Sequence, residues 1–148
     1  MHAIRLLLAS SLLALTSASW AATSCQNVVQ TLNATLNPRL DNPTALAQTL
    51  TTLQQSGHLP DSYITKRNAQ AAGWRPGSRL WSVLPGKSIG GDRFGNYEHR
   101  LPNGQYQEAD LDYRGGKRGA KRLIIGRNGQ RYITVDHYQT FIEVPACQ

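Results

Sequence analysis

The feature of this chain that most constrains its fold is a change in hydrophobic spacing near Pro85. Before Pro85, leucines recur at helical intervals, as in Leu46, Leu50 and Leu53. After it, apolar and polar residues alternate, and the pair Asn128-Gly129 between two apolar runs indicates a hairpin turn. Helices followed by strands indicate an α+β protein, with N-terminal helices packed on a C-terminal antiparallel sheet of about five strands.

The spacing also predicts where the individual elements lie. The expected helices are residues 26–36, a helix capped by Asn42 that begins at Pro43 and ends before Gly57, residues 66–72, and one or two further turns within 78–84. The expected strands are residues 87–94, 107–113, 122–126, 130–136 and 140–144.

The first residues have the pattern of a secretory signal peptide. Arg5 precedes an apolar run from Leu6 to Leu15, and small residues flank Trp20 in the segment Ser19-Trp20-Ala21. The run is shorter than the ~20 apolar residues that a membrane span requires. We therefore expect residues 1–21 to be a signal peptide, the protein to be secreted (extracellular, or periplasmic on the way out), and the mature chain to have no membrane partner.

Two cysteines remain after such a cleavage, and they lie near the two ends of the mature chain. In an exported protein, the pair Cys25 and Cys147 is more typical of a disulfide than of a redox or metal site. The sequence contains no Cys-x-x-Cys motif and no Cys/His cluster with zinc spacing. We therefore expect a structural disulfide, no metal and no cofactor.

The charge balance indicates a polyanionic partner. Sixteen Lys and Arg residues against nine Asp and Glu residues leave a net charge of +7, which suits RNA, DNA or an anionic membrane surface. Between Arg114 and Arg131 there are seven cations and no acid, which in part is a solvated basic face. Glu108, Asp110 and Asp112 precede this segment at alternate positions, so in a strand they would share one face.

Like charges on one face of a sheet repel one another unless cations lie opposite. Arg118 and Arg122, near the start of the next expected strand, are placed to provide those cations. A lone histidine is usually structural, but His137 follows a later strand and can meet Glu108 on the same face. A Glu and a His among Arg and Lys suit general acid and base catalysis on a phosphodiester. Without a metal, such cleavage needs an internal nucleophile, which the 2′-hydroxyl of RNA supplies and DNA lacks.

The segment from Leu59 to Val144 closely resembles the secreted bacterial guanyl-preferring ribonucleases of the barnase and binase type. The matching stretches, in family order, are LPDSYITK at 59–66, AQAAGW at 69–74, PGKSIGGD at 85–92, EADLDY at 108–113 and DHYQTF at 136–141. The resemblance implies the microbial ribonuclease fold in residues 41–148, after an N-terminal extension at 22–40. It also implies cleavage of single-stranded RNA 3′ of guanosine by transesterification to a 2′,3′-cyclic phosphate, which is then hydrolysed, without a cofactor.

The resemblance further implies roles for single residues. Glu108 corresponds to the general base and His137 to the general acid, while Lys66, Arg118 and Arg122 correspond to the cations that hold the scissile phosphate. Tyr138 and a base-recognition loop are expected to bind substrate, and that loop comprises Phe94, Gly95, Asn96, Tyr97 and Glu98. Within it, Glu98 is the residue expected to select guanine, and Asp110 is expected to organise the two arginines rather than to take part in the chemistry.

The chain departs from the family pattern at several positions. Tyr97 stands where the best-known members carry an Arg that also contacts their protein inhibitor. The resemblance offers a barstar-like inhibitor as a possible partner, and Tyr97 leaves this partner open. The segment 22–40 and the pair Cys25 and Cys147 have no counterpart there, and we expect the disulfide to join the extra helix to the last strand.

Two other functions remain open on the sequence. One is a non-catalytic RNA-binding module on the same fold, and the other is an antibacterial ribonuclease effector. The simultaneous presence of Lys66, Glu108, Arg118, Arg122 and His137 favours the enzyme, because a binder has no need of a carboxylate opposite phosphate. RNA is the expected partner, and we expect a monomer.

Overall fold

The computed structural model describes residues 2–4, 7–16 and 23–148. Residues 2–4 and 7–16 form neither helix nor strand and expose their apolar side chains, among them Leu7 and Leu15. No helix in the described ranges is long and apolar enough to cross a membrane. The cleavage site expected after Ala21 lies outside the described residues.

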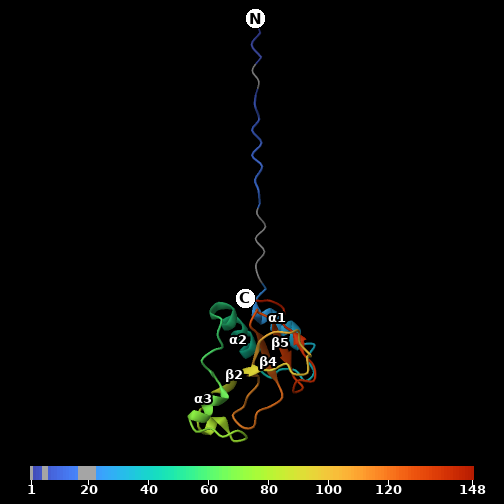
Figure 1. Ribbon diagram of the computed structural model, residues 1–148. Coiled ribbons are helices and arrows are strands. Elements are labelled where there is room, and N and C mark those ends of the chain that lie inside the picture. Colours follow the sequence, from blue (N-terminus) through green and yellow to red (C-terminus); the bar gives the residue numbers. More distant parts are fainter. Residues whose placement is uncertain (1, 5–6, 17–22) are drawn as a thin grey trace.

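The folded part has the expected α+β architecture (Figure 1). Its helices are α1 (Cys25–Asn33), α2 (Pro43–Ser56), α3 (Lys66–Ala71) and the 3-10 turn η1 (Leu80–Ser82). Its strands are β1 (Tyr63–Ile64), β2 (Ser88–Phe94), β3 (Tyr106–Asp110), β4 (Arg122–Gly126), β5 (Arg131–Thr134) and β6 (Ile142–Glu143). Figure 1 shows α1 and α2 together near one end of the body and α3 toward the other.

Local capping explains where the long helix begins and ends. The Asn42 side chain accepts a hydrogen bond from the Ala45 N–H at 3.1 Å, and Pro43 occupies the first helical position. Gly57 ends the helix in the left-handed region at φ 76°, and its N–H donates to the Leu53 carbonyl. The predicted boundaries of this helix are confirmed.

The sheet runs in the order β1-β2-β3-β4-β5-β6, and every neighbouring pair is antiparallel except β1 with β2. Strand β1 was not predicted, because two residues carry no readable alternation. The register of β3 with β4 pairs Glu108 with Ile124 and Asp110 with Arg122. Since side chains alternate along a strand, Glu108 and Asp110 point to one face and Ala109 to the other.

Each face of the sheet has its own core. On one face, α1 and α2 pack against the buried side chains of Ala109, Leu123 and Ile133. On the other, Ile124 packs with an aromatic cluster that comprises Tyr106, Tyr132, Phe94, Tyr138 and Phe141. Helices α1 and α2 therefore pack on one face of the sheet, and the aromatic cluster lies on the opposite face.

The disulfide between Cys25 and Cys147 is confirmed. Beside it, the Cys25 N–H donates to the Gln148 carbonyl at 3.1 Å, and the Gln148 N–H donates to the Thr23 carbonyl at 2.9 Å. Figure 1 shows the C-terminus next to α1. The bridge joins α1 to the segment after β6 rather than to the last strand itself, because β6 ends at Glu143.

The expectation that three carboxylates share one strand face is wrong for Asp112. Strand β3 ends at Asp110, and Asp112 adopts φ 54°, which turns its side chain toward the start of α2. There it accepts hydrogen bonds from the N–H groups of Asp41 at 2.7 Å and Asn42 at 3.0 Å, and from Lys121 Nζ at 2.8 Å. Asp112 therefore connects the sheet to α2.

Candidate active site

Two arginines converge on one buried carboxylate at the end of β3. Arg118 donates from Nε and Nη2 to the two oxygens of Asp110, each at 2.7 Å, and Arg122 Nε lies 3.0 Å from the same group. Asp110 is 2% exposed and Arg122 is 4% exposed, so both charges depend on this pairing. Hydrogen bonds to Asp110 raise the pKa of Arg118 despite its partial burial. Asp110 thus holds both guanidinium groups, and its organising role in the site stays a prediction.

Glu108 lies beside this cluster on the same face. Its Oε2 accepts a hydrogen bond from the Tyr138 hydroxyl at 3.0 Å, and Arg118 Nη2 lies 3.9 Å from its Oε1. The Tyr138 oxygen in turn accepts from Arg122 Nε at 3.2 Å. Burial raises the pKa of the Tyr138 phenol; Arg122 opposes this shift and Glu108 adds to it. The phenol therefore stays protonated and serves as a donor to Glu108.

His137 and Tyr138 form a tight turn in which both residues have positive φ, 54° and 69°. Such backbone needs support from its surroundings. The His137 N–H donates to the Ala120 carbonyl at 3.1 Å, and the Tyr138 N–H donates to Thr134 Oγ1 at 3.0 Å. The His137 side chain is exposed, and its ring centroid lies 4.8 Å from that of Tyr138. The turn thus presents the imidazole to solvent at the border of the Glu108 cluster.

Asp136 is the group that holds this turn, and sequence reasoning missed it. Its carboxylate accepts from the N–H groups of Gln139 and Thr140 and from the hydroxyls of Thr134 and Thr140. Burial would raise the pKa of Asp136, but these hydrogen bonds outweigh it and the pKa is lowered. An Asp directly before His and Tyr is the only sequence signal for this role.

Lys66 is the first residue of α3. Its N–H donates to Asp92 Oδ2 at 3.0 Å, which fixes the first turn of the helix against β2. The Lys66 side chain lines a hollow of about 390 Å³ together with Lys117 and Arg118. The structure therefore brings Glu108, Arg118 and Arg122 into one contact network, His137 to its border, and Lys66 into a hollow that shares Arg118.

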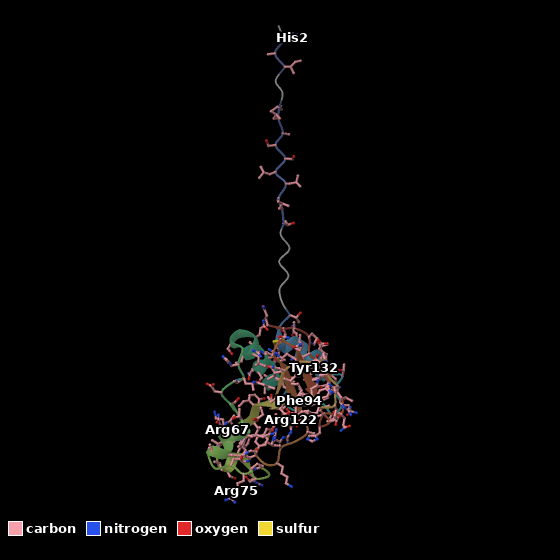
Figure 2. All side chains as sticks on the ribbon, in the orientation of Figure 1. His2, Arg67, Arg75, Phe94, Arg122 and Tyr132 are labelled. Atoms are coloured by element: carbon pink, nitrogen blue, oxygen red, sulfur yellow. A yellow bond between two sulfur atoms is a disulfide. The ribbon has the colours of Figure 1, made fainter. Side chains whose placement is uncertain are left out.

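The predicted base-recognition loop divides into packed and open residues. Phe94 stacks on Tyr138, with ring centroids 5.5 Å apart, and Asn96 is buried and bonds the N–H and carbonyl groups of Leu101. Tyr97 is 83% exposed. Figure 2 shows Phe94, Arg122 and Tyr132 in the central part of the folded body. Substrate contact by this loop stays a prediction.

Glu98 and Gly95 complete the loop. The Glu98 side chain is 74% exposed, and Arg100 Nε donates to its Oε2 at 2.8 Å. Arg100 also donates from Nη1 to the Gln139 carbonyl, which ties this loop to the His137 turn. A Cβ on Gly95 would lie 2.2 Å from the Tyr97 ring, so the absence of a side chain at residue 95 lets Tyr97 fold over the loop.

The fold and this cluster define the class of the protein, an α+β domain with an acid, a histidine and paired arginines on its open sheet face. A family model for ribonucleases matches residues 46–145. The chain is 48% identical over 90 residues to a ribonuclease of Heyndrickxia coagulans, a match that covers 58% of this chain and 83% of that protein. It is equally similar to ribonucleases of Bacillus intermedius and Bacillus pumilus, and covers 56% of the length of each. The chain belongs to the ribonuclease family.

Proposed function

We propose that this protein is a metal-independent endoribonuclease that cleaves single-stranded RNA 3′ of guanosine. Its family and its ribonuclease relatives support the endoribonuclease activity. The observation that carries the mechanism is the network of Glu108, Tyr138, Arg122 and Arg118 with an exposed His137 at its border. It combines a proton acceptor, a proton donor and fixed positive charge on one face.

In the proposed first step, the Glu108 carboxylate removes the proton of the 2′-hydroxyl, and that oxygen attacks the adjacent phosphorus. His137 gives a proton to the leaving 5′-oxygen, and the product is a 2′,3′-cyclic phosphate. In the second step water attacks the cyclic phosphate, His137 now takes the proton of the water, and Glu108 returns a proton to the 2′-oxygen. The reaction needs one acid and one base, and we assign these roles to His137 and Glu108.

The cations act on the phosphate. Extra negative charge develops on the phosphoryl oxygens in the transition state, and donors that are already fixed stabilise it without reorganisation. Asp110 holds Arg118 and Arg122 in place, and Lys66 adds a third cation across the shared hollow. Asp110 and Glu108 together balance the charges of the two arginines, so the net positive charge offered to the substrate comes from Lys66.

Guanine preference is proposed to come from the loop that ends at Glu98. A carboxylate can accept from the N1–H and N2–H groups of guanine, an edge that no other RNA base presents in the same pattern. In the structure that carboxylate pairs with Arg100, so guanine has to share or displace this contact. The exposed ring of Tyr97 offers a surface on which a base can stack.

The test is a digest, in the presence of a chelator, of a short RNA that contains one G, beside its DNA equivalent, with products identified by mass. A cyclic phosphate only 3′ of G, with DNA intact, is the expected result. Cyclic phosphate after every base would contradict the role of the Glu98 loop and leave the acid–base mechanism standing. Binding that weakens with salt, without any cleavage, would replace this proposal by the non-catalytic RNA-binding module.

We also propose that the protein is secreted. The proposal is supported by the cation, apolar run and small-residue site in residues 1–21. The mass of the protein recovered from culture medium tests it, because cleavage after Ala21 makes Ala22 the first residue. Recovery only from the cytosol with Met1 retained would contradict secretion.

A further inference from the structure

We propose that the protein has a second RNA-binding site, a groove for phosphodiester groups formed by Arg93, Arg127 and Arg131 on the sheet face opposite Glu108. The identity of the ligand rests on the proposed function. The groove itself rests on the register of the sheet and on the charges described below.

The groove follows one row of residues across four strands. Arg93 of β2 pairs with Gln107 of β3, Gln107 with Ile125 of β4, and Ile125 with Arg131 of β5. Residues of one row point to the same face, here the face on which Leu123 packs against the helices. The helices do not cover the whole face, since Arg93 and Gln107 remain exposed. The arginines thus lie at the open end of the helical face.

A hollow of about 800 Å³ lies over this row, roughly twice the volume of the hollow beside Lys66. Its polar lining residues are Arg93, Gln105, Gln107, Arg127 and Arg131, and its other lining residues are chiefly glycines, together with Tyr106 and Ile125. Adjacent strands are about 4.8 Å apart, so the three steps from β2 to β5 span roughly 14 Å. This length accommodates a short piece of nucleic-acid backbone.

The charge of the groove is not compensated. Within the described residues, no acidic side chain lines it and no carboxylate lies within ion-pair distance of its arginines. By contrast, Arg118 and Arg122 are tied to Asp110, and Lys121 to Asp112. Burial lowers the pKa of Arg131, which is what an unpaired, partly buried cation experiences. An anion placed here would relieve this cost.

The guanidinium groups are also held in position. Arg127 Nη1 donates to Gln105 Oε1 at 2.9 Å, and the Arg127 N–H donates to the Gln105 carbonyl at 2.9 Å. Arg131 Nη1 donates to the carbonyls of Gly126 at 3.2 Å and Gln130 at 3.1 Å. No other described residue accepts from the remaining nitrogens of Arg131. A planar guanidinium fixed by one nitrogen presents its other donors to phosphate, which arginine binds in a two-point geometry.

The groove cannot serve the nucleotides at the scissile bond. Glu108 belongs to the neighbouring row of β3 and therefore points to the opposite face. RNA that occupies both places has to pass around the edge of the sheet. The groove therefore acts on long RNA and not on a dinucleotide, and this difference separates it from the catalytic cations.

The test compares the double variant Arg93→Gln/Arg127→Gln with the charge-matched control Arg39→Gln/Arg79→Gln. All four arginines are exposed, and none of them takes part in an ion pair among the described residues. The readouts are kcat/KM on a guanosine-containing dinucleotide, kcat/KM on a long unstructured RNA, and the affinity for an uncleavable all-deoxy strand of the same length at two salt concentrations.

The groove variant is expected to cleave the dinucleotide at the wild-type rate and the long RNA several-fold more slowly. Each phosphate contact contributes about 0.7 to the slope of log affinity against log salt concentration for single-stranded nucleic acid. The wild-type protein should therefore lose roughly sevenfold more affinity than the groove variant when the salt rises from about 50 to 200 mM, because the variant lacks two contacts. Unchanged affinity for the long strand would overturn the proposal. An equal loss in the control would also overturn it, since the effect would then be one of net charge.

The readouts separate this proposal from the proposed function. If neither substrate is cleaved but the groove variant alone loses affinity for the deoxy strand, the groove stands and the endoribonuclease proposal fails. If cleavage is normal in all variants and the deoxy strand binds them equally, the enzyme stands and the groove fails. An anionic protein as the true ligand would appear as this second outcome.

Discussion

The two faces of the central sheet are built from alternate residues of the same strands, and both bury apolar side chains, but within the described part of the chain only one of them also buries charge. On the helical face, Leu123 is 0% exposed and packs among apolar groups. On the other face, Glu108 is 9% exposed and lies beside Asp110 and Arg122. Buried charge costs free energy unless it is paired, whereas buried leucine stabilises outright. The helical face therefore stabilises the fold through apolar packing, and the other face combines an apolar cluster with the charged groups on which we propose the chemistry.

The largest effect should come from breaking the charged face. Glu108→Gln and His137→Ala each remove one of the two groups proposed to transfer protons, and such groups contribute about 10²–10⁴-fold to rate. We expect cleavage to fall by that factor with RNA binding largely kept, and wild-type activity to follow a bell-shaped pH dependence. Initial rates on the one-G RNA measure this. Near-native activity in either variant, with its melting temperature unchanged, would remove that residue from the mechanism.

The next effect concerns the disulfide, which lies on the helical side of the molecule. A bridge across 122 residues removes chain entropy from the unfolded state, worth about 4–5 kcal/mol in a chain-entropy model. We expect Cys25→Ser/Cys147→Ser to lower the free energy of unfolding in urea by this order, and to keep the wild-type rate while folded. The matched control is the reduced wild-type protein, which should behave alike.

The bridge itself has a separate check. Intact mass after alkylation, with and without prior reduction, should show two modified thiols only after reduction. Two alkylated thiols without reductant would contradict the bridge between Cys25 and Cys147.

A third variant pair sharpens the comparison of the faces. Leu123 and Ile124 are neighbours, both 0% exposed, and point to opposite faces. Truncation of either to Ala should cost about 2–5 kcal/mol of unfolding free energy. Leu123→Ala should keep its rate per folded molecule, while Ile124→Ala should lose rate as well, because Ile124 pairs with Glu108 in the register. Equal cleavage rates per folded molecule in the two variants would contradict the proposal that only the Glu108 face takes part in catalysis.

The smallest effect is a pH dependence at the helix junction. Burial would raise the pKa of Asp112, but hydrogen bonds from Lys121, Asp41 and Asn42 outweigh it and the pKa is lowered. A carboxyl group whose pKa is lowered by folding stabilises the folded protein at any pH above its pKa in the unfolded chain, which is about 3.9. This stabilisation is lost as the pH falls through the lower pKa of the folded state. We expect Asp112→Asn to cost about 1 kcal/mol at neutral pH and nothing in strong acid. A difference in unfolding free energy between the wild-type protein and Asp112→Asn that is the same at every pH would contradict this expectation.

The sequence predicted the elements whose signals are local. Asn42, Pro43 and Gly57 fix the bounds of α2, and alternation predicted β4 at its observed residues 122–126. Strand β1 was missed because it exists only through pairing with β2, a tertiary effect. The expected fourth strand extended to Asp136, but β5 ends at Thr134 because the Asp136 carboxylate accepts from the following turn.

The candidate site was predictable where charge pairing specifies it. Acids at alternate positions and nearby arginines indicated that Glu108 and Asp110 meet Arg118, which the structure shows. The predicted position of Asp112 on the face of Glu108 was wrong, because its backbone has a positive φ that a non-glycine residue does not reveal in the sequence. Two contacts could not be predicted from the sequence. Asp136 supports the His137 turn, and Arg100 connects Glu98 to the Gln139 carbonyl in that turn. Both depend on how loops pack in the folded protein.

The bond between Cys25 and Cys147 closes the folded domain into a covalent loop, so the chain enters and leaves this loop at the same place. A pull applied to the chain on either side of this loop is borne by the sulfur–sulfur bond, and β1 to β6, which lie between the two cysteines, carry no load. A protein-unfolding enzyme that pulls on one end of the chain would have to translocate two polypeptide segments at the same time, unless the disulfide is first reduced. The mechanical resistance of the folded domain thus depends on whether this disulfide is oxidised or reduced.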